Sequence, residues 1–252
     1  MIDLTLHNAD LDGAPFFYEG DSIGVLLIHG LTATTTEVRF LADSLHRYGW
    51  TISAPLLPGH GTNLFDLERY RWQDWVEAVA SAYQSLAVRC GQVFVGGESM
   101  GGLLACYLAR THPEIAGLLL YAPAFRARSL WLTPFVHLFY RFKSKKNLND
   151  QLLWKGYRYH STRAAFQLFL LQRVMESRLK LIHQPLSMFL GKRDTAISLS
   201  AAEMVFDQIP SINKIFHIYG ESGHCMILDR EKEIITKDSI RFIQDILKEK
   251  TE

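Results

Sequence analysis

The chain has 252 residues, 48% of them hydrophobic and 21% charged, which is enough to bury a sizeable core in a globular protein. Its formal net charge of +1 provides no broad basic surface, so we expect no nucleic-acid partner. Three cysteines without metal-ligand spacing argue against a disulfide framework or a zinc site. The lack of a visible signal peptide and of any apolar run near ~18 residues favours a cytoplasmic location.

Short apolar runs alternate along the chain with segments in which apolar residues recur every three or four positions. The runs are typical of strands buried on both faces, and the spaced segments are typical of helices. In chain order we expect a strand at 23–28, a helix from Val38 to Gly49, a strand at 51–55, a helix at 72–86, a strand at 92–96, a helix at 102–109, strands at 117–121 and 186–190, a helix at 199–208, a strand at 214–219 and a helix at 231–248. This alternation predicts an α/β fold with a mostly parallel central sheet and helices on both faces.

Residues 124–184 interrupt the alternation. This stretch is rich in aromatic side chains, and its spacing predicts helices rather than strand–helix units. Because it lies between two expected strands, we predict a helical cap inserted over the carboxyl ends of the sheet, between core segments 1–123 and 185–252. Trp131 and Phe135 are the cap residues that we expect to influence substrate binding.

Basic residues without acidic neighbours lie within this insertion, interleaved with aromatic residues. A patch of this kind can contact lipid, but a solvated helix face is commoner, so a membrane surface is the less favoured partner. The basic residues are Arg126, Arg128, Arg141, Lys143, Lys145 and Lys146.

The most informative segment is the pentapeptide Gly97-Glu98-Ser99-Met100-Gly101, which follows an expected strand and precedes an expected helix. A G-x-S-x-G sequence in this context forms a sharp turn that presents the serine hydroxyl at the edge of a sheet. The helix N-terminus and the following N–H then point at the place where negative charge develops during acyl transfer. Ser99 is therefore the expected nucleophile.

A serine nucleophile needs a histidine base and usually a carboxylate that orients the base. His224 follows the last expected strand on a loop of small residues, and Asp194 follows the strand before it in a short polar turn. Asp207 is the alternative acid, but its place on a helical pattern points it towards solvent. The order Ser99, Asp194, His224 is the order expected of α/β-hydrolases.

The loop after the first buried strand supplies the second half of an oxyanion site. We expect the backbone N–H groups of Leu31 and Met100 to bind the oxyanion together. His29 and His60 lie on loops near this site, and we expect both to be structural, with hydrogen bonds to neighbouring backbone groups.

These motifs resemble the α/β-hydrolase family, and within it the small bacterial carboxylesterases and monoacylglycerol lipases. The resemblance covers about residues 20 to 248 and rests on Leu27–Thr32, Ala54–Thr62, Asp74-Trp75, Gly97–Gly102, Ser222-Gly223-His224 and Leu228-Asp229. It implies a Ser99–Asp194–His224 triad, oxyanion amides at Leu31 and Met100, and an inserted cap over an apolar acyl pocket. It also implies that no metal or organic cofactor takes part.

The sequence thus predicts a serine carboxylic-ester hydrolase that forms an acyl-enzyme on Ser99 and binds a small ester with an apolar acyl group. Other acyl hydrolases (thioesterase, lactonase or amidase) use the same residues, as do C–C hydrolases and cofactor-free haloperoxidases. A non-catalytic ligand-binding protein on this fold is the remote alternative. The motifs specify neither the acyl chain length nor the oligomeric state.

Overall fold

A seven-stranded sheet forms the centre of the computed structural model, which describes residues 5–145 and 151–249. Lys146 of the basic stretch lies outside the described residues. The strands are β2 (Phe16–Tyr18), β3 (Ile23–Ile28), β4 (Thr51–Ala54), β5 (Gln92–Glu98), β6 (Gly117–Tyr121), β10 (Leu186–Gly191) and β11 (Lys214–Tyr219). Their spatial order is β11-β10-β6-β5-β3-β4-β2, and all neighbours are parallel except β2, which pairs antiparallel with β4. The predicted mostly parallel sheet is confirmed.

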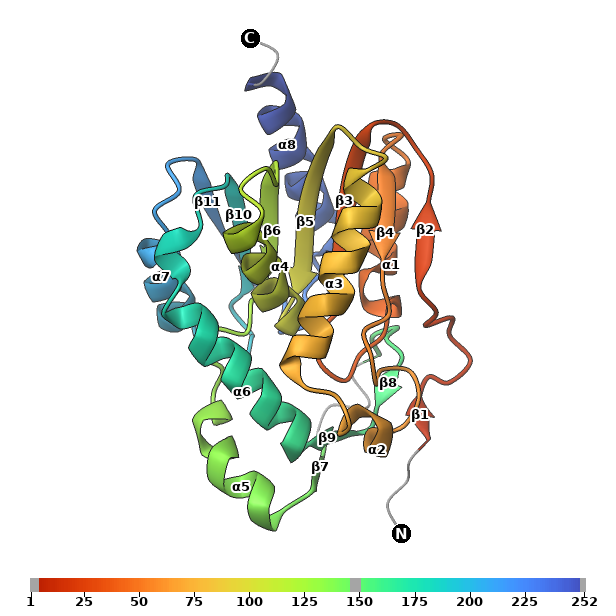
Figure 1. Cartoon of the computed structure of the whole chain (residues 1–252), viewed down its shortest axis with the longest axis vertical. Coiled ribbons are helices and arrows are strands. Elements are labelled where there is room, and N and C mark those ends of the chain that lie inside the picture. The colour runs from red at the N-terminus through yellow and green to blue at the C-terminus, as the bar shows by residue number, and fades with distance from the viewer. Residues whose placement is uncertain (1–4, 146–150, 250–252) are drawn as a thin grey trace.

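Helices cover both faces of this sheet (Figure 1). On one face α1 (Thr36–His46) lies against α8 (Lys232–Glu249), and on the other α3 (Trp72–Ala87) lies against α4 (Met100–Thr111). The short α2 (Leu64–Leu67) precedes α3, and α7 (Leu199–Gln208) packs beside β10. Because the sheet is covered on both faces, its central strands are mostly apolar.

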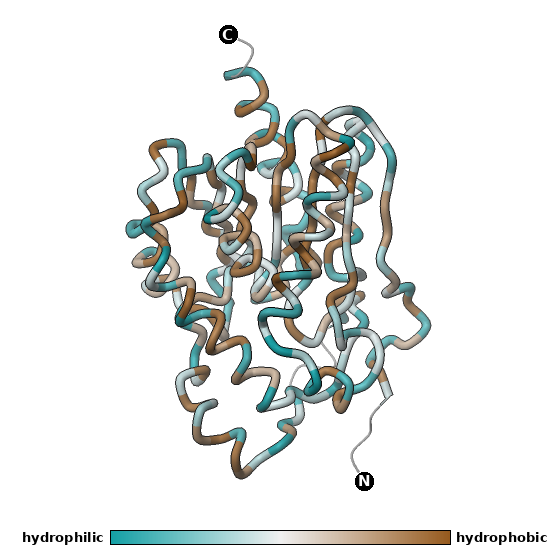
Figure 2. The backbone as a smooth tube through the Cα atoms, viewed as in Figure 1, coloured by the Kyte–Doolittle hydropathy of each residue, from teal (hydrophilic) through white to brown (hydrophobic). Residues whose placement is uncertain are grey.

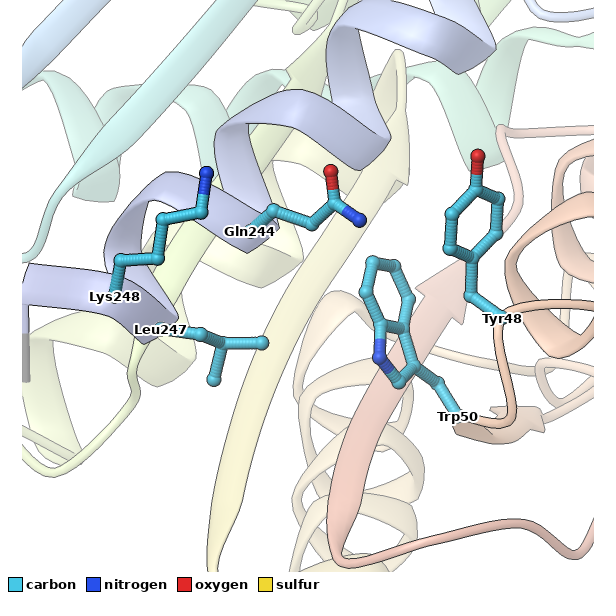
Figure 3. Close-up of a pocket in the computed structure, with 5 residues that line it drawn as sticks. All are labelled: Tyr48, Trp50, Gln244, Leu247 and Lys248. Atoms are coloured by element: carbon cyan, nitrogen blue, oxygen red, sulfur yellow. The ribbon is translucent and has the colours of Figure 1, made fainter. Parts of the chain in front are cut away.

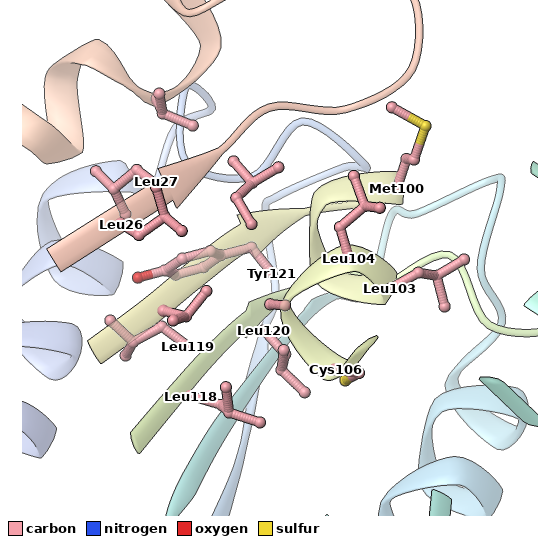
Figure 4. Close-up of a cluster of buried hydrophobic side chains, with 14 of the residues drawn as sticks. Leu26, Leu27, Met100, Leu103, Leu104, Cys106, Leu118, Leu119, Leu120 and Tyr121 are labelled. Atoms are coloured by element: carbon pink, nitrogen blue, oxygen red, sulfur yellow. The ribbon is translucent and has the colours of Figure 1, made fainter. Parts of the chain in front are cut away.

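The core lies where α4 crosses the central strands (Figure 4). Leu26 and Leu27 of β3, Leu118–Tyr121 of β6 and Leu103 and Leu104 of α4 are all buried there, with at most 1% of each side chain exposed. At roughly 1.5–3 kcal/mol for each large apolar side chain buried, this cluster fixes α4 against the sheet. It therefore also fixes the turn between β5 and α4 that carries Ser99.

The order in which successive strands are added to the sheet reverses at β3. After β3 the chain adds β4 on one side, then crosses over to place β5 on the other side, with Ile28 of β3 opposite Gly97 of β5. In parallel α/β sheets, ligands bind at the carboxyl ends of strands where the order reverses. Gly30 and Ser99, which follow these two strands, both lie at that point.

The segment between β6 and β10 lies beyond the carboxyl ends of the strands, at the bottom of Figure 1. It contains η1 (Leu130–Leu132), α5 (Thr133–Phe139), β7 (Phe142–Ser144), β8 (Gly156–Tyr157), β9 (Tyr159–Ser161), α6 (Thr162–Glu176) and η2 (Leu179–Leu181). Helices alone are expected here, so the three short strands are a correction. β7 pairs with β9, and β8 pairs with β1 (Leu6–His7), which lies near the start of the chain. Strands of two or three residues carry too little periodicity to be recognised in a sequence.

A surface depression between the start of β4 and the end of α8 lies at the opposite edge of the sheet from Ser99 (Figure 3). It is lined by Tyr48, Trp50, Gln244, Leu247 and Lys248. Trp50 immediately precedes β4, so the depression lies at the amino ends of the strands, away from the candidate site. Within the described residues, every helix is too short or too polar to cross a membrane.

Candidate active site

Ser99 occupies a strained turn between β5 and α4. Its φ of 54° and ψ of −112° lie outside the regions that a residue with a side chain normally adopts, at a cost of about 1–3 kcal/mol. The backbone is held there by a 2.9 Å hydrogen bond from the Ser99 N–H to the carbonyl of Tyr121 on β6. The sheet thus stabilises a turn that local preference opposes.

Two glycines leave room for this turn. A Cβ on Gly97 would lie 2.3 Å from the carbonyl carbon of Gly101, and a Cβ on Gly101 would lie 2.1 Å from the carbonyl oxygen of Ile28. Both distances are shorter than real carbon contacts, so the G-x-S-x-G spacing is a packing requirement. The start of α4 lies directly against the end of β3 as a result.

The hydroxyl of Ser99 lies at one end of a hydrogen-bonded chain of three side chains. Its Oγ is 2.9 Å from Nε2 of His224, and Nδ1 of His224 is 2.8 Å from Oδ2 of Asp194. The second carboxylate oxygen of Asp194 accepts the N–H groups of Ala196, at 2.7 Å, and Ile197, at 2.9 Å. The structure therefore brings together three residues from the turns after β5, β10 and β11.

The geometry determines how the protons are arranged. Because Asp194 offers only acceptor oxygens when ionised, Nδ1 of His224 carries the proton and Nε2 is free to accept one from Ser99. Burial by itself lowers the pKa of His224, but the hydrogen bond and charge of Asp194, together with the charge of Glu37, raise that pKa above its ordinary value. The site thus favours an imidazole that accepts a proton from the serine.

The loop after β3 carries the first expected oxyanion amide. Nε2 of His29 accepts the N–H of Leu57 at 3.1 Å, so Nδ1 carries the ring proton and donates it to the carbonyl of Gly30 at 2.9 Å. Burial lowers the pKa of His29 to about 4, so the ring is neutral. Since C=O and N–H point in opposite directions across a trans peptide, this bond also sets the direction of the Leu31 N–H.

Met100, the second expected oxyanion residue, is the first residue of α4 and follows Ser99 directly. Its N–H belongs to the helix N-terminus, where backbone donors lack partners within the helix and the helix dipole favours negative charge. The N–H of Leu31 donates to no other described residue. Both amides therefore remain available to a ligand at Ser99.

His60 is buried beside His29, with ring centroids 4.9 Å apart. Its Nδ1 lies 3.2 Å from the carbonyl oxygen of Pro58. Burial lowers the pKa of His60 well below its ordinary value. The backbone contact agrees with the structural role expected of this residue.

The two expected cap residues lie at the surface of the insertion. Trp131 on η1 is 65% exposed and Phe135 on α5 is 67% exposed, and Figure 2 shows hydrophobic residues along α5 at the lower left of the view. Leu138 and Phe139 of the same helix are also exposed. The packed side of α5 rests on α6 instead. Asp207, the alternative acid, lies exposed on α7, away from this hydrogen-bonded chain.

The burial of two acidic residues near Ser99 is not predicted from the sequence. Glu37 on α1 and Glu98 at the end of β5 are 5% and 0% exposed, although glutamate rarely enters a core unpaired. A signal for Glu37 is available, because it lies one helical turn before Leu41 and two before Leu45 on the apolar stripe of α1. Glu98 ends an apolar strand run, directly before Ser99.

The fold and the hydrogen-bonded serine, histidine and aspartate define the class of serine hydrolases built on an α/β sheet. Residues 22–153 match the family described as serine aminopeptidase, S33, and the chain belongs to this family of α/β-hydrolases. It is 33% identical to a thermostable monoacylglycerol lipase of Bacillus sp. (strain H-257), over 92% of this chain and 95% of the relative. It is 25% identical to a carboxylesterase of Bacillus subtilis (strain 168), over 92% of this chain and 96% of that enzyme.

A solved structure of a metagenome-derived lipolytic enzyme superposes with a TM-score of 0.87. It is 27% identical to this chain, and the match covers 92% of this chain and 98% of that one. The predicted resemblance to bacterial carboxylesterases and monoacylglycerol lipases is confirmed, and the chain is a serine ester hydrolase of that type.

Proposed function

We propose that this enzyme hydrolyses monoacylglycerols and related esters with an apolar acyl group, through an acyl-enzyme on Ser99. The observation that carries the proposal is the continuous path from Ser99 Oγ through the His224 ring to Asp194, with contacts of 2.9 and 2.8 Å. The substrate class is supported by the 33% identity to a monoacylglycerol lipase over nearly the whole of both chains. The polar leaving group is then glycerol.

In the first step, His224 Nε2 takes the Ser99 proton while Oγ attacks the carbonyl carbon of the ester. The carbonyl oxygen gains a negative charge, which the N–H groups of Leu31 and Met100 stabilise. The bond from carbon to the leaving oxygen then breaks, and the imidazolium gives its proton to that oxygen. Glycerol departs, and the acyl group remains on Ser99.

In the second step, water replaces the leaving alcohol. His224 accepts a proton from water, whose oxygen attacks the acyl carbon, and collapse of the tetrahedral intermediate returns the proton to Ser99. Asp194 keeps the histidine proton on Nδ1 and stabilises the imidazolium that forms twice in each cycle. The carboxylic acid is released.

The test compares ester classes and a serine-directed label. A series of p-nitrophenyl esters from acetate to palmitate, run beside monoacylglycerols, thioesters, lactones and anilides, gives the preferred bond and acyl length. A fluorophosphonate is expected to label Ser99 alone, and Ser99→Ala is expected to keep its fold and lose ester hydrolysis. Labelling at another residue, or faster cleavage of thioesters or anilides than of esters, would contradict the proposal.

The oxyanion role of Leu31 is tested through its backbone. Leu31→Ala keeps the N–H and is expected to retain most activity, whereas Leu31→Pro removes the donor and is expected to lower kcat by about 10²–10³. Proline also restricts the preceding residue, so circular dichroism must first show a folded protein. A folded Leu31→Pro enzyme with the wild-type kcat would remove Leu31 from the mechanism.

A further inference from the structure

Glu37 and Glu98 are two acidic side chains buried next to the reacting groups, and the mechanism above uses neither. Removing a carboxyl group from water costs several kcal/mol unless its contacts offset the loss. Each carboxyl group is therefore unfavourable in its place unless its contacts compensate. What each carboxyl group contacts is therefore informative.

Glu37 holds the loop that carries Leu31. Its Oε2 accepts the N–H of Gly30 at 2.5 Å, and His29 holds the carbonyl of the same glycine. A Cβ on Gly30 would lie 3.1 Å from that Oε2 and 3.4 Å from the Cβ of Ser99. Gly30 thus lies between the carboxyl group and the nucleophile, with both of its polar backbone groups fixed.

Glu98 holds the loop that carries His224. Its Oε1 accepts the N–H of Ile227 at 3.4 Å. Ile227 comes three positions after His224. Since Glu98 directly precedes Ser99 in the chain, it links the backbone of the nucleophile turn to the backbone of the histidine loop.

The two carboxyl groups differ in how well their surroundings suit a negative charge. Burial, together with the charges of Glu37 and Asp194, raises the pKa of Glu98 well above its ordinary value, and Glu98 Oε2 has no partner among the described residues. A neutral acid fits that position better than a carboxylate. Burial raises the pKa of Glu37 as well, and the Gly30 N–H and the charge of His224 offset part of that effect. Of the two carboxyl groups, Glu37 therefore has the surroundings better suited to a negative charge.

We propose that Glu37 and Glu98 are positioning residues for the reaction at Ser99. Glu37 sets the place of the oxyanion loop through Gly30, and Glu98 sets the place of the histidine loop through Ile227. Neither touches the substrate. This inference rests on the proposed roles of Ser99, Leu31 and His224, because it concerns how their loops are held relative to one another.

The test uses graded substitutions of Glu37 and a distant control. Glu37→Leu removes the hydrogen-bond acceptor for the Gly30 N–H. Glu37→Gln keeps an acceptor oxygen on a side chain of the same length. Glu37→Asp keeps the carboxyl group on a side chain that is one methylene shorter. The control is Gln184→Leu, because Gln184 is also buried and hydrogen-bonds two backbone carbonyls, at 2.7 and 3.1 Å, at the opposite edge of the sheet. A fluorophosphonate run to completion counts the folded active sites in each preparation.

Two rates are then measured for each counted site, the kcat for p-nitrophenyl butyrate and the rate constant of phosphonylation. Displacing a catalytic group by about 1 Å costs about 10²-fold, so Glu37→Leu is expected to lower both rates by about 10–10²-fold with KM within about twofold. Glu37→Gln is expected to retain most of the wild-type value of both rates and to react faster than Glu37→Asp. Gln184→Leu is expected to lower the melting temperature without changing either rate.

The inference is overturned if Glu37→Leu keeps both rates within twofold of the wild type, or if Glu37→Gln, although folded, is as slow as Glu37→Leu. If Glu37→Leu does not fold, the rates of the other two variants test the inference: Glu37→Gln must react faster than Glu37→Asp, and the reverse order overturns it. For Glu98, Glu98→Gln is expected to be nearly as active as the wild type, and Glu98→Leu to slow phosphonylation. A wild-type protein that phosphonylates at Ser99 but cleaves no ester would contradict the proposed function and leave the phosphonylation test of Glu37 intact.

Discussion

Replacing Gly101 with alanine separates helix preference from packing at the nucleophile turn. Alanine is favoured over glycine inside a helix by about 1 kcal/mol, and Gly101 is the second residue of α4. Its added Cβ, however, would lie 2.1 Å from the carbonyl oxygen of Ile28 and 2.8 Å from the carbonyl carbon. Ordinary contact begins at 3.4 Å, so α4 and β3 must separate by about 1 Å.

Packing is expected to outweigh helix preference. Overpacking of this kind costs about 1–3 kcal/mol, and here the opposing atoms belong to a central strand that cannot rotate away. The separation also moves the loop after Ile28, which carries Leu31, away from Met100. Since a displacement of about 1 Å costs about 10²-fold in rate, kcat for each titrated site is expected to fall about 100-fold.

The matched control is Gly91→Ala, because a Cβ on Gly91 meets no atom within 4 Å. That change is expected to be neutral or to stabilise by about 0.4–1 kcal/mol through the unfolded chain. Thermal unfolding followed by circular dichroism and kcat on p-nitrophenyl butyrate, normalised to fluorophosphonate-labelled sites, measure both effects. The reasoning is refuted if Gly101→Ala matches the wild type in melting temperature and in kcat, or if Gly91→Ala destabilises as much.

Three further predictions concern the acid, the pH dependence and the insertion. Asp194→Asn is expected to lower kcat by about 10³–10⁴-fold, because His224 then takes the wrong tautomer. Asp207→Asn, on the exposed face of α7, is expected to change kcat little. A larger loss of kcat in Asp207→Asn than in Asp194→Asn would show that the acid is misassigned. The neutral ring of His224 is the active form, and the pKa of this ring is raised. The value of kcat/KM is therefore expected to fall with decreasing pH through a midpoint above 6.5. A midpoint below 6.5 would contradict the environment assigned to His224. Trp131→Ala and Phe135→Ala, both at exposed positions, are expected to shift acyl-chain preference with little change in melting temperature; equal loss on every chain length would argue against substrate contact.

The amino-acid sequence by itself determined the parallel strands of the sheet and the identity of the three linked side chains, but it did not predict the antiparallel edge strand β2. Apolar runs buried on both faces mark the parallel strands, and the rule that such strands share a carboxyl edge predicts that the turns after them meet. Ser99 and His224 are 125 residues apart, yet each follows a strand directly, so their meeting follows from strand positions alone. Gly97 is likewise explained by the local turn, whereas Gly101 is required by the close approach of β3.

Only the tertiary structure decided the contacts that lack a local signal. β1 pairs with β8 across about 150 residues, and strands this short acquire their conformation from the partner rather than from their own sequence. The burial of Glu37 and Glu98 depends in the same way on which backbone N–H groups face them, and these groups lie on loops outside the helix and the strand that carry the two side chains. Hydrophobic patterning specifies which faces turn inward, but it carries no information on how polar groups are paired once inside.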